Sequence, residues 1–125
     1  MGYDLHVVRT RHWADAKLVP ISKLEVEAVV AADPDLDWSS DDYIEMKDDS
    51  GSITRYLMIN WNGLPSFWWY RDKILGSGLN EDGIRKLIDI AGALNAHVVG
   101  DDGEHYVLRQ RILGGLRVTR VVPDA

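Results

Sequence analysis

Carboxylates are concentrated in one stretch of this chain and are its most distinctive chemical feature. Between Glu25 and Asp49 the only basic residue is Lys47. The acidic residues of this stretch are Glu25, Glu27, Asp33, Asp35, Asp37, Asp41, Asp42, Glu45, Asp48 and Asp49. Like charges repel and destabilise a compact state, so a folded domain that concentrates them often has a cationic partner. Carboxylates at this density can hold a metal ion, exchange protons with a substrate, or dock a basic protein.

The metal interpretation needs a spacing that the chain does not have. A calcium-binding loop follows the order D-x-[DN]-x-[DN]-G-x₅-E. Asp33, Asp35 and Asp37 alternate as that loop requires, but neither the glycine nor the final glutamate follows in place. The chain also has no cysteine, and therefore no thiolate ligand for zinc or for an iron–sulfur cluster. We therefore expect no metal and no other cofactor.

The residue types that often carry catalysis form no familiar motif here. His6, His12, His97 and His105 make neither an H-E-x-x-H arrangement nor a pair at helical spacing. The chain contains no G-x-S-x-G, no G-x-G-x-x-G and no P-loop sequence. The acids of residues 101–104 surround a glycine, and a tight turn between two strands explains them better than a catalytic cluster does. The sequence therefore favours a binding protein over an enzyme.

The chemistry that remains is attraction of a basic partner. The net charge of −6 disfavours nonspecific binding to nucleic acid or to an anionic membrane. Trp38 and Tyr43 lie among the acids, where aromatic side chains can anchor an interface. The expected partner-binding residues are Asp35, Asp37, Trp38, Asp41, Asp42, Tyr43, Glu45, Asp48 and Asp49. A solvated surface that only keeps the protein soluble explains the same acids about equally well, so both interpretations stand.

A function of a different class rests on the aromatic residues. The segment from Tyr56 to Tyr70 is rich in them, and an aromatic-lined pocket around Trp61 and Trp69 would suit a small molecule or a substrate. Packing into a core is the more common role for such side chains. The alternative to a protein-binding function is therefore a small-molecule-binding or enzymatic domain.

Nothing in the sequence predicts export or a membrane anchor. The start, MGYDLHVV, lacks the basic region and apolar stretch of a signal peptide. No apolar run approaches the roughly 18 residues that a membrane-spanning helix needs. The absence of cysteine is typical of a reducing compartment, so we expect a cytoplasmic protein.

Two helices are expected, one at the start of the acidic stretch and one in the second half of the chain. Ser22, with Glu25 three positions later, forms a capping box that predicts a helix over residues 22–32, and Pro34 stops it. Its expected core-facing stripe is Leu24, Ala28 and Ala31. Asn80 predicts the cap of a second helix over residues 81–94. Its expected stripe is Ile84, Leu87, Ile88, Ala91 and Leu94.

Alternating residues and turn signals predict the strands. They are expected at 3–10, 42–47, 52–61, 66–75, 97–99 and 104–111, with loops at 11–19 and 36–40. Residues 113–125 are either an extra strand or a loose tail. The order β-α-β-β-β-α-β-β predicts one α+β domain over residues 1–125, with a mostly antiparallel sheet and two helices packed on one face. A chain of 125 residues is long enough to bury one core.

Two segments resemble a group of small bacterial proteins of uncharacterised function. They are Tyr3-Asp4-Leu5-x-Val7 and Ala96-His97-Val98-Val99-Gly100-Asp101-Asp102-Gly103-Glu104-x-Tyr106, with Trp61 as a weaker match between them. The resemblance implies a single α+β domain. Small acidic cytoplasmic proteins of this kind are often encoded as immunity proteins beside polymorphic or contact-dependent inhibition toxins. It therefore also implies a cognate toxin as the partner, and we expect a basic nuclease.

Overall fold

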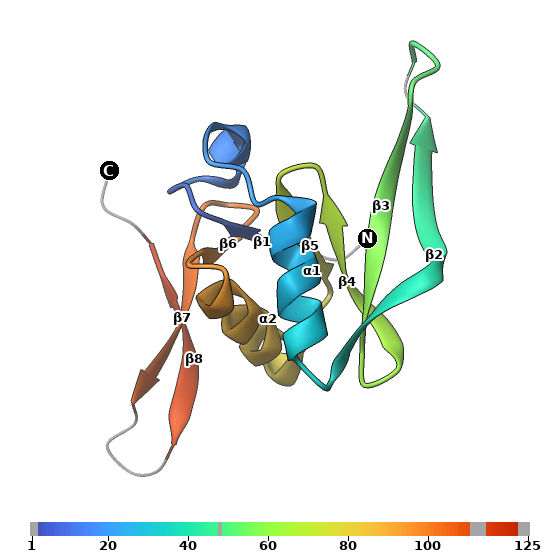
Figure 1. The fold of residues 1–125 in the computed structure, drawn as a ribbon. Helices are drawn as coiled ribbons and strands as arrows, with labels where there is room; N and C mark the ends of the chain where they lie inside the picture. Colours follow the sequence, from blue (N-terminus) through green and yellow to red (C-terminus); the bar gives the residue numbers. More distant parts are fainter. Residues whose placement is uncertain (1–2, 48, 111–114, 123–125) are drawn as a thin grey trace.

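The structure is a computed structural model that describes residues 3–47, 49–110 and 115–122, and for residues 40–46, 54–56, 110 and 116 it describes the backbone alone. The elements are β1 (Asp4–Val8), the 3₁₀ helix η1 (Trp13–Leu18), α1 (Lys23–Ala32), β2 (Leu36–Lys47), β3 (Ile53–Trp61), β4 (Leu64–Tyr70), β5 (Lys73–Ser77), α2 (Glu81–Ala93), β6 (His97–Gly100), β7 (His105–Gln110) and β8 (Leu116–Val121). Within the described ranges, the strands form one antiparallel sheet in the order β2-β3-β4-β5-β1-β6-β7-β8. Figure 1 shows α1 and α2 together on one side of this sheet. The α+β class predicted from the sequence is confirmed.

The first helix, α1, starts where the sequence predicts but buries a different face. The Ser22 hydroxyl accepts from the Glu25 N–H, and the Glu25 carboxylate accepts from the Ser22 N–H, so the capping box forms. Val26 and Val30 are the buried residues, because their spacing of four positions also defines one helix face. The expected stripe is wrong, since its members are all exposed: Leu24, Ala28 and Ala31.

The second helix, α2, carries the larger buried face. The Asn80 side chain accepts from the Gly83 N–H at 2.9 Å, which starts the helix at the predicted position. The predicted stripe packs towards the core: Leu87, Ala91 and Leu94 are buried, and Ile84 and Ile88 are half-buried. Ile90 is buried as well.

The prediction of a loop over residues 36–40 is wrong. This segment is the first part of β2, whose Leu36 pairs with Trp61 and whose Trp38 pairs with Ile59. Aspartate and serine disfavour strands in isolation, but cross-strand packing against β3 overrides that preference.

The prediction of a single strand over residues 66–75 is also wrong. A turn at residues 71–72 separates β4 from β5, and Tyr70 pairs with Lys73 across it. Arg71 lies in the left-handed region with φ 55°. Turns of this kind usually use glycine, asparagine or aspartate, so arginine gives no turn signal in the sequence. Near the end of the chain, the segment left open as strand or tail contains β8.

The main core lies between the sheet and the two helices. Both helices contribute to one buried cluster with residues of the sheet, among them Leu5, Val7, Ile59, Phe67, Ile74 and Val98. Trp61 and Trp69 pack against this cluster, and the Trp69 indole N–H donates to the Ile21 carbonyl at 3.0 Å. Both tryptophans therefore serve the core.

The other face of the sheet is covered in part by η1, which lies in a segment predicted to be irregular. Val8, Val99 and Ala16 form a second, smaller buried cluster, against which Trp13 packs. Farther along this face, half-buried Trp68 pairs across strands with Met58 and Leu75.

Candidate functional site

The acidic stretch begins at the end of α1 and continues along a free edge of the sheet. β2 is the first strand in the sheet order, so only one of its two backbone edges has a strand partner within the described residues. It is 12 residues long. With β3 it forms a hairpin that projects beyond η1 and the helices (Figure 1). Free edges are templates for pairing with another chain, and charged side chains protect them against unwanted pairing.

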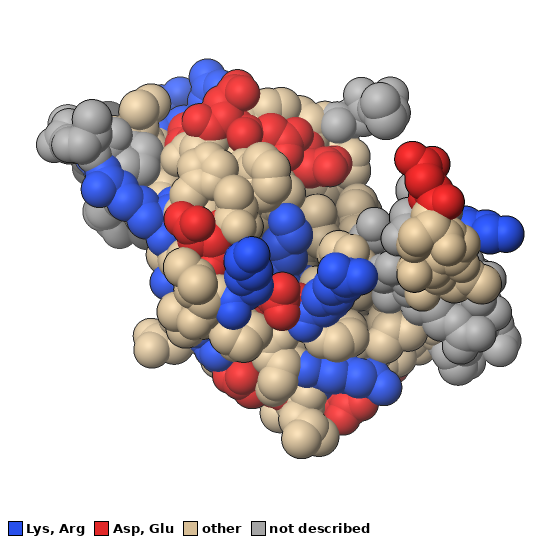
Figure 2. Space-filling model, turned by 90° about the horizontal axis from the view of Figure 1, so that it is seen from above, with Lys and Arg blue, Asp and Glu red and all other residues tan. Residues whose placement is uncertain are grey.

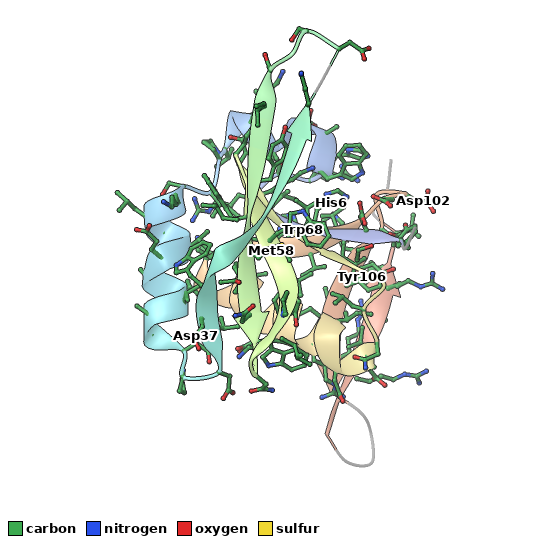
Figure 3. All side chains as sticks on the ribbon, turned by 90° about the vertical axis from the view of Figure 1, so that its right-hand side faces the viewer. His6, Asp37, Met58, Trp68, Asp102 and Tyr106 are labelled. Atoms are coloured by element: carbon green, nitrogen blue, oxygen red, sulfur yellow. The ribbon has the colours of Figure 1, made fainter. Side chains whose placement is uncertain are left out.

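The residues predicted to bind a partner occupy this edge and its approach. Asp35 and Asp37 are exposed at the start of β2, and Asp49 is exposed at the hairpin tip. In Figure 3, Asp37 lies beside α1, away from His6 and Asp102. Asp41, Asp42, Tyr43 and Glu45 belong to β2, but their side chains lie outside the described part of the structure, and Asp48 lies outside it altogether.

The pairing of β2 with β3 is interrupted where two of the acids stand. Trp38 pairs with Ile59 and Tyr43 pairs with Leu57, so residues 39–42 face a gap of one residue on β3. This shift of register, a bulge or similar irregularity, includes Asp41 and Asp42. Bulges bend a strand away from the regular ladder and often occur beside functional sites.

A groove of about 500 Å³ separates α1 from the start of β2. Its lining combines apolar residues with carboxylates: Glu27, Val30, Ala31, Asp33, Pro34, Leu36, Asp37 and Trp38. Trp38, expected to be an exposed anchor, is instead half-buried and packs against the core beside this groove. We call this groove, together with β2, the acidic edge.

Two acids of the stretch serve the fold. The Asp33 carboxylate lies 2.5 Å from the Lys86 ammonium of α2, and this hydrogen bond lowers the pKa of Asp33. Glu25 pairs with Arg9, and that hydrogen bond lowers the pKa of Glu25 to about 2. Asp35 and Asp37 form no ion pair with any side chain that the structure describes. The carboxylates available to a partner therefore begin at Asp35.

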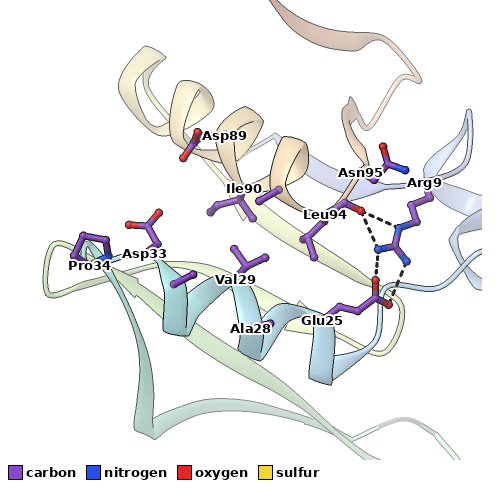
Figure 4. A pocket seen from close by; sticks show the side chains of 12 residues that line it. Arg9, Glu25, Ala28, Val29, Asp33, Pro34, Asp89, Ile90, Leu94 and Asn95 are labelled. Carbon is purple, nitrogen blue, oxygen red and sulfur yellow. Dashed lines mark hydrogen bonds and ion pairs between the residues drawn. The ribbon is translucent and has the colours of Figure 1, made fainter.

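A second, larger groove lies between α1 and α2, with a volume of about 730 Å³ (Figure 4). Ala28, Val29, Ile90 and Leu94 form its apolar part. Arg9 closes one end by donating to the Leu94 carbonyl at 2.9 and 3.0 Å and by pairing with Glu25 (Figure 4). This groove has the size and apolar lining of a small-molecule site.

Sequence reasoning missed a polar cluster on the opposite face of the sheet. The His6 imidazole stacks on Trp13, with ring centroids 5.0 Å apart, and its Nε2 lies 2.8 Å from Asp101 Oδ1. The Lys73 ammonium lies 4.9 Å from the centre of the Trp13 ring. Burial lowers the pKa values of His6 and Lys73. The only sign of this cluster in the sequence was His6 at an alternating position of a predicted strand. That position does not show which residues from other elements lie beside it.

Charges elsewhere are mixed. Figure 2 views the domain from the η1 end and shows acidic and basic side chains intermingled over it.

The described residues contain no group of three or more histidine, aspartate and glutamate side chains arranged to hold a metal ion. No helix in the described ranges is long and apolar enough to cross a membrane.

Comparisons with models of protein families, with curated proteins and with solved structures found no match.

Proposed function

We propose that this protein is a cytoplasmic immunity protein that binds a cognate bacterial toxin through the acidic edge and thereby neutralises it. The observation that carries the proposal is the groove between α1 and β2. It combines Trp38, an apolar floor and the carboxylate of Asp37, which forms no ion pair with any described side chain. The groove continues into the free edge of β2, along which the sequence supplies further acids.

The lining of the groove matches a lysine or arginine side chain of the partner. The aliphatic stem of such a side chain can pack against Val30 and Leu36, while its charged head reaches Asp37. The ring of Trp38 offers a cation–π contact, which is worth about 0.5–2 kcal/mol depending on how far water is excluded. A basic residue seated here would fix the register of the toxin on β2.

Neutralisation follows from occupying the surface that the toxin uses for its own substrate. A nuclease holds the phosphate backbone with lysine and arginine, and carboxylates on a rigid strand compete for the same cations. Complementary charge also speeds encounter, to association rates of about 10⁸–10⁹ M⁻¹s⁻¹ at low salt.

The test is association kinetics with the cognate toxin domain that the proposal requires. The association rate should fall steeply between about 50 and 500 mM salt, because the Debye length shrinks over that range. Asp37→Lys should slow association at low salt at least about tenfold, because a cation then repels the partner at the groove. Asp89→Lys is the matched control, since Asp89 is an exposed acid of α2. An association rate that does not change with salt concentration, or equal effects of the two substitutions on that rate, would contradict the proposal.

The groove between α1 and α2 favours a second candidate function, binding of a small apolar molecule. Its floor of Ala28, Val29 and Ile90 would take such a ligand without polar partners. A thermal-shift screen of apolar compounds distinguishes the two functions. Ala28→Trp, which fills this groove, should remove stabilisation by a ligand there and leave toxin binding at the acidic edge intact.

A further inference from the structure

All histidines of the chain contact one segment, residues 10–18, which we call the η1 cover. The chain has four histidines, and they come from β1, β6, β7 and the cover itself. Beneath the cover lie Val8 and Val99, both fully buried, on the sheet face opposite the helices. Three histidines from three strands therefore hold one short piece of chain against the sheet, and the fourth, His12, caps the 3₁₀ helix within it.

Two of them bind the start of the cover. His97 Nε2 lies 2.5 Å from the Thr10 carbonyl oxygen, and His105 Nε2 lies 2.9 Å from the Arg11 carbonyl oxygen. A carbonyl only accepts, so both Nε2 atoms carry a proton and donate. The two rings stack with centroids 4.7 Å apart. A proton added to each Nδ1 would place two cations at that distance.

A third histidine starts the 3₁₀ helix. His12 is the N-cap of η1, and its Nδ1 accepts from the Ala14 N–H at 3.0 Å. An acceptor nitrogen must be unprotonated. In the closed cover His12 therefore serves as an acceptor and caps η1.

The fourth histidine holds Trp13, the first residue of η1. His6 stacks on the Trp13 ring and donates from Nε2 to Asp101, which leaves Nδ1 buried with no hydrogen-bond partner in the described structure. Protonation would place a buried N–H there without an acceptor, and a buried unsatisfied donor is costly. The Trp13 indole N–H also donates to the Asp101 carbonyl at 3.0 Å.

Other charged groups facing these rings do not reverse this preference. Asp101 and Asp4 favour protonation of His6, and Lys73 of β5 opposes it. Burial outweighs the two carboxylates, so the pKa of His6 lies below its ordinary value. The pKa of His97 is lowered as well, because burial and the neighbouring His105 outweigh the hydrogen bond to the Thr10 carbonyl, which raises it.

We propose that the η1 cover is an acid-sensitive latch, which opens when its histidines take up protons and then exposes the apolar sheet face around Val8 and Val99. Burial and the missing partner of Nδ1 disfavour a proton on His6, and burial beside His105 disfavours one on His97, whereas free imidazoles bind protons with a pKa near 6.5. The open state therefore binds more protons, and falling pH favours it by linkage. For each histidine that must stay neutral, the opening equilibrium rises about 30-fold between pH 7.5 and pH 5.0.

Amide hydrogen exchange tests the latch directly. The Ala14, Asp15 and Val19 amides are bonded only within the cover, to His12 Nδ1, the His12 carbonyl and the Ala16 carbonyl. After correction for intrinsic exchange, their protection should fall at least about 30-fold from pH 7.5 to pH 5.0. The amides of Ile84 and Leu94 in α2 should change less than about threefold.

Variants assign the effect to the histidines. His97→Gln keeps a side-chain donor for the Thr10 carbonyl but cannot titrate, so it should reduce the response by the share of one histidine, up to about 30-fold. Asp15→Asn, in the first turn of η1, removes a carboxylate instead and should leave the response unchanged. Equal protection of the cover at both pH values, a loss shared equally by α2, or a full response in His97→Gln would each overturn the proposal.

Discussion

Lys86 of α2 reaches Asp33, the residue that ends α1, with its ammonium nitrogen 2.5 Å from the Asp33 carboxylate. Both side chains are largely shielded, at 12% and 19% exposure. Asp33 also accepts from the Asp35 N–H at 2.9 Å. One ion pair therefore joins the two helices at the point where the chain turns into β2, and it sets the position of the acidic edge.

Lys86→Met should destabilise the protein by about 1–3 kcal/mol, because the shielded Asp33 carboxylate loses its cation while the apolar stem remains. Urea unfolding measures the loss. Lys23→Met is the control, since the pair of Lys23 with Glu27 is exposed and such pairs contribute about 0.5 kcal/mol or less. Equal losses in the two variants would show that the Asp33 pair has no special role.

Leu87→Ala should destabilise by about 2–5 kcal/mol, the range for a leucine deleted from a packed core. Leu87 is fully buried, whereas Leu24 of α1 is 77% exposed. Leu24→Ala should therefore change the free energy of unfolding by less than about 0.5 kcal/mol. Chemical denaturation of both variants tests which helix faces pack on the sheet, and a larger loss in Leu24→Ala would contradict the fold.

Stability should fall as the pH drops below about 6.5, the pKa of histidine in an unfolded chain. Burial lowers the pKa values of His6 and His97 in the folded state, so between that pH and their folded pKa values the unfolded chain binds more protons. The slope should reach up to about 1.4 kcal/mol per pH unit for each of the two groups. Urea unfolding from pH 7.5 to 5.5 measures it. His97→Gln should make the slope shallower, and an unchanged slope would exclude His97 as a contributor.

Gly100→Ala should destabilise by about 1–3 kcal/mol, because it breaks a shielded hydrogen bond. The Tyr3 hydroxyl donates to the Glu104 carboxylate at 2.6 Å, and a Cβ on Gly100 would stand 1.5 Å from that carboxylate. Gly92→Ala is the opposite control, since a Cβ there meets open space within α2. It should stabilise by about 0.4–1 kcal/mol by restricting the unfolded chain. Thermal or urea unfolding compares the pair, and equal effects would contradict the close approach at Gly100.

Reversing the charges of Asp41, Asp42 and Glu45 to lysine should abolish protection against the cognate toxin. The proposal requires these three side chains to face solvent, so folding should stay nearly intact, with a stability change within about 0.5 kcal/mol, because exposed charges contribute little. The control reverses three exposed acids elsewhere, Asp15, Asp89 and Asp102, and matches the change in net charge. Survival of toxin-expressing cells is the measurement. Full protection by the first variant would move the interface away from β2.

Local chemistry in the sequence determined where the helices begin. The Ser22–Glu25 capping box and the Asn80 cap act within a few residues, so they form the same way in any fold that keeps those helices. The sequence also predicted the buried face of α2, because its apolar residues follow one helical period and need no distant partner to be recognised. In α1 the valines and the alanine-rich face both have helical spacing, and only contact with the sheet selects Val26 and Val30.

The tertiary structure alone decided which distant residues meet. Residues 36–40 form a strand because they pair with β3, and local preference does not predict that pairing. In the turn at residues 71–72 the left-handed position is taken by Arg71, and Asp72 alone is too weak a turn signal to predict it. The acids looked alike in sequence, yet Lys86 and Arg9 occupy Asp33 and Glu25 and leave Asp35 and Asp37 unpaired among the described side chains. The four histidines are spread over 100 positions of the chain, from His6 to His105. They converge on one segment because β1, β6 and β7 are neighbours in the sheet, and strand order is a property of the whole fold.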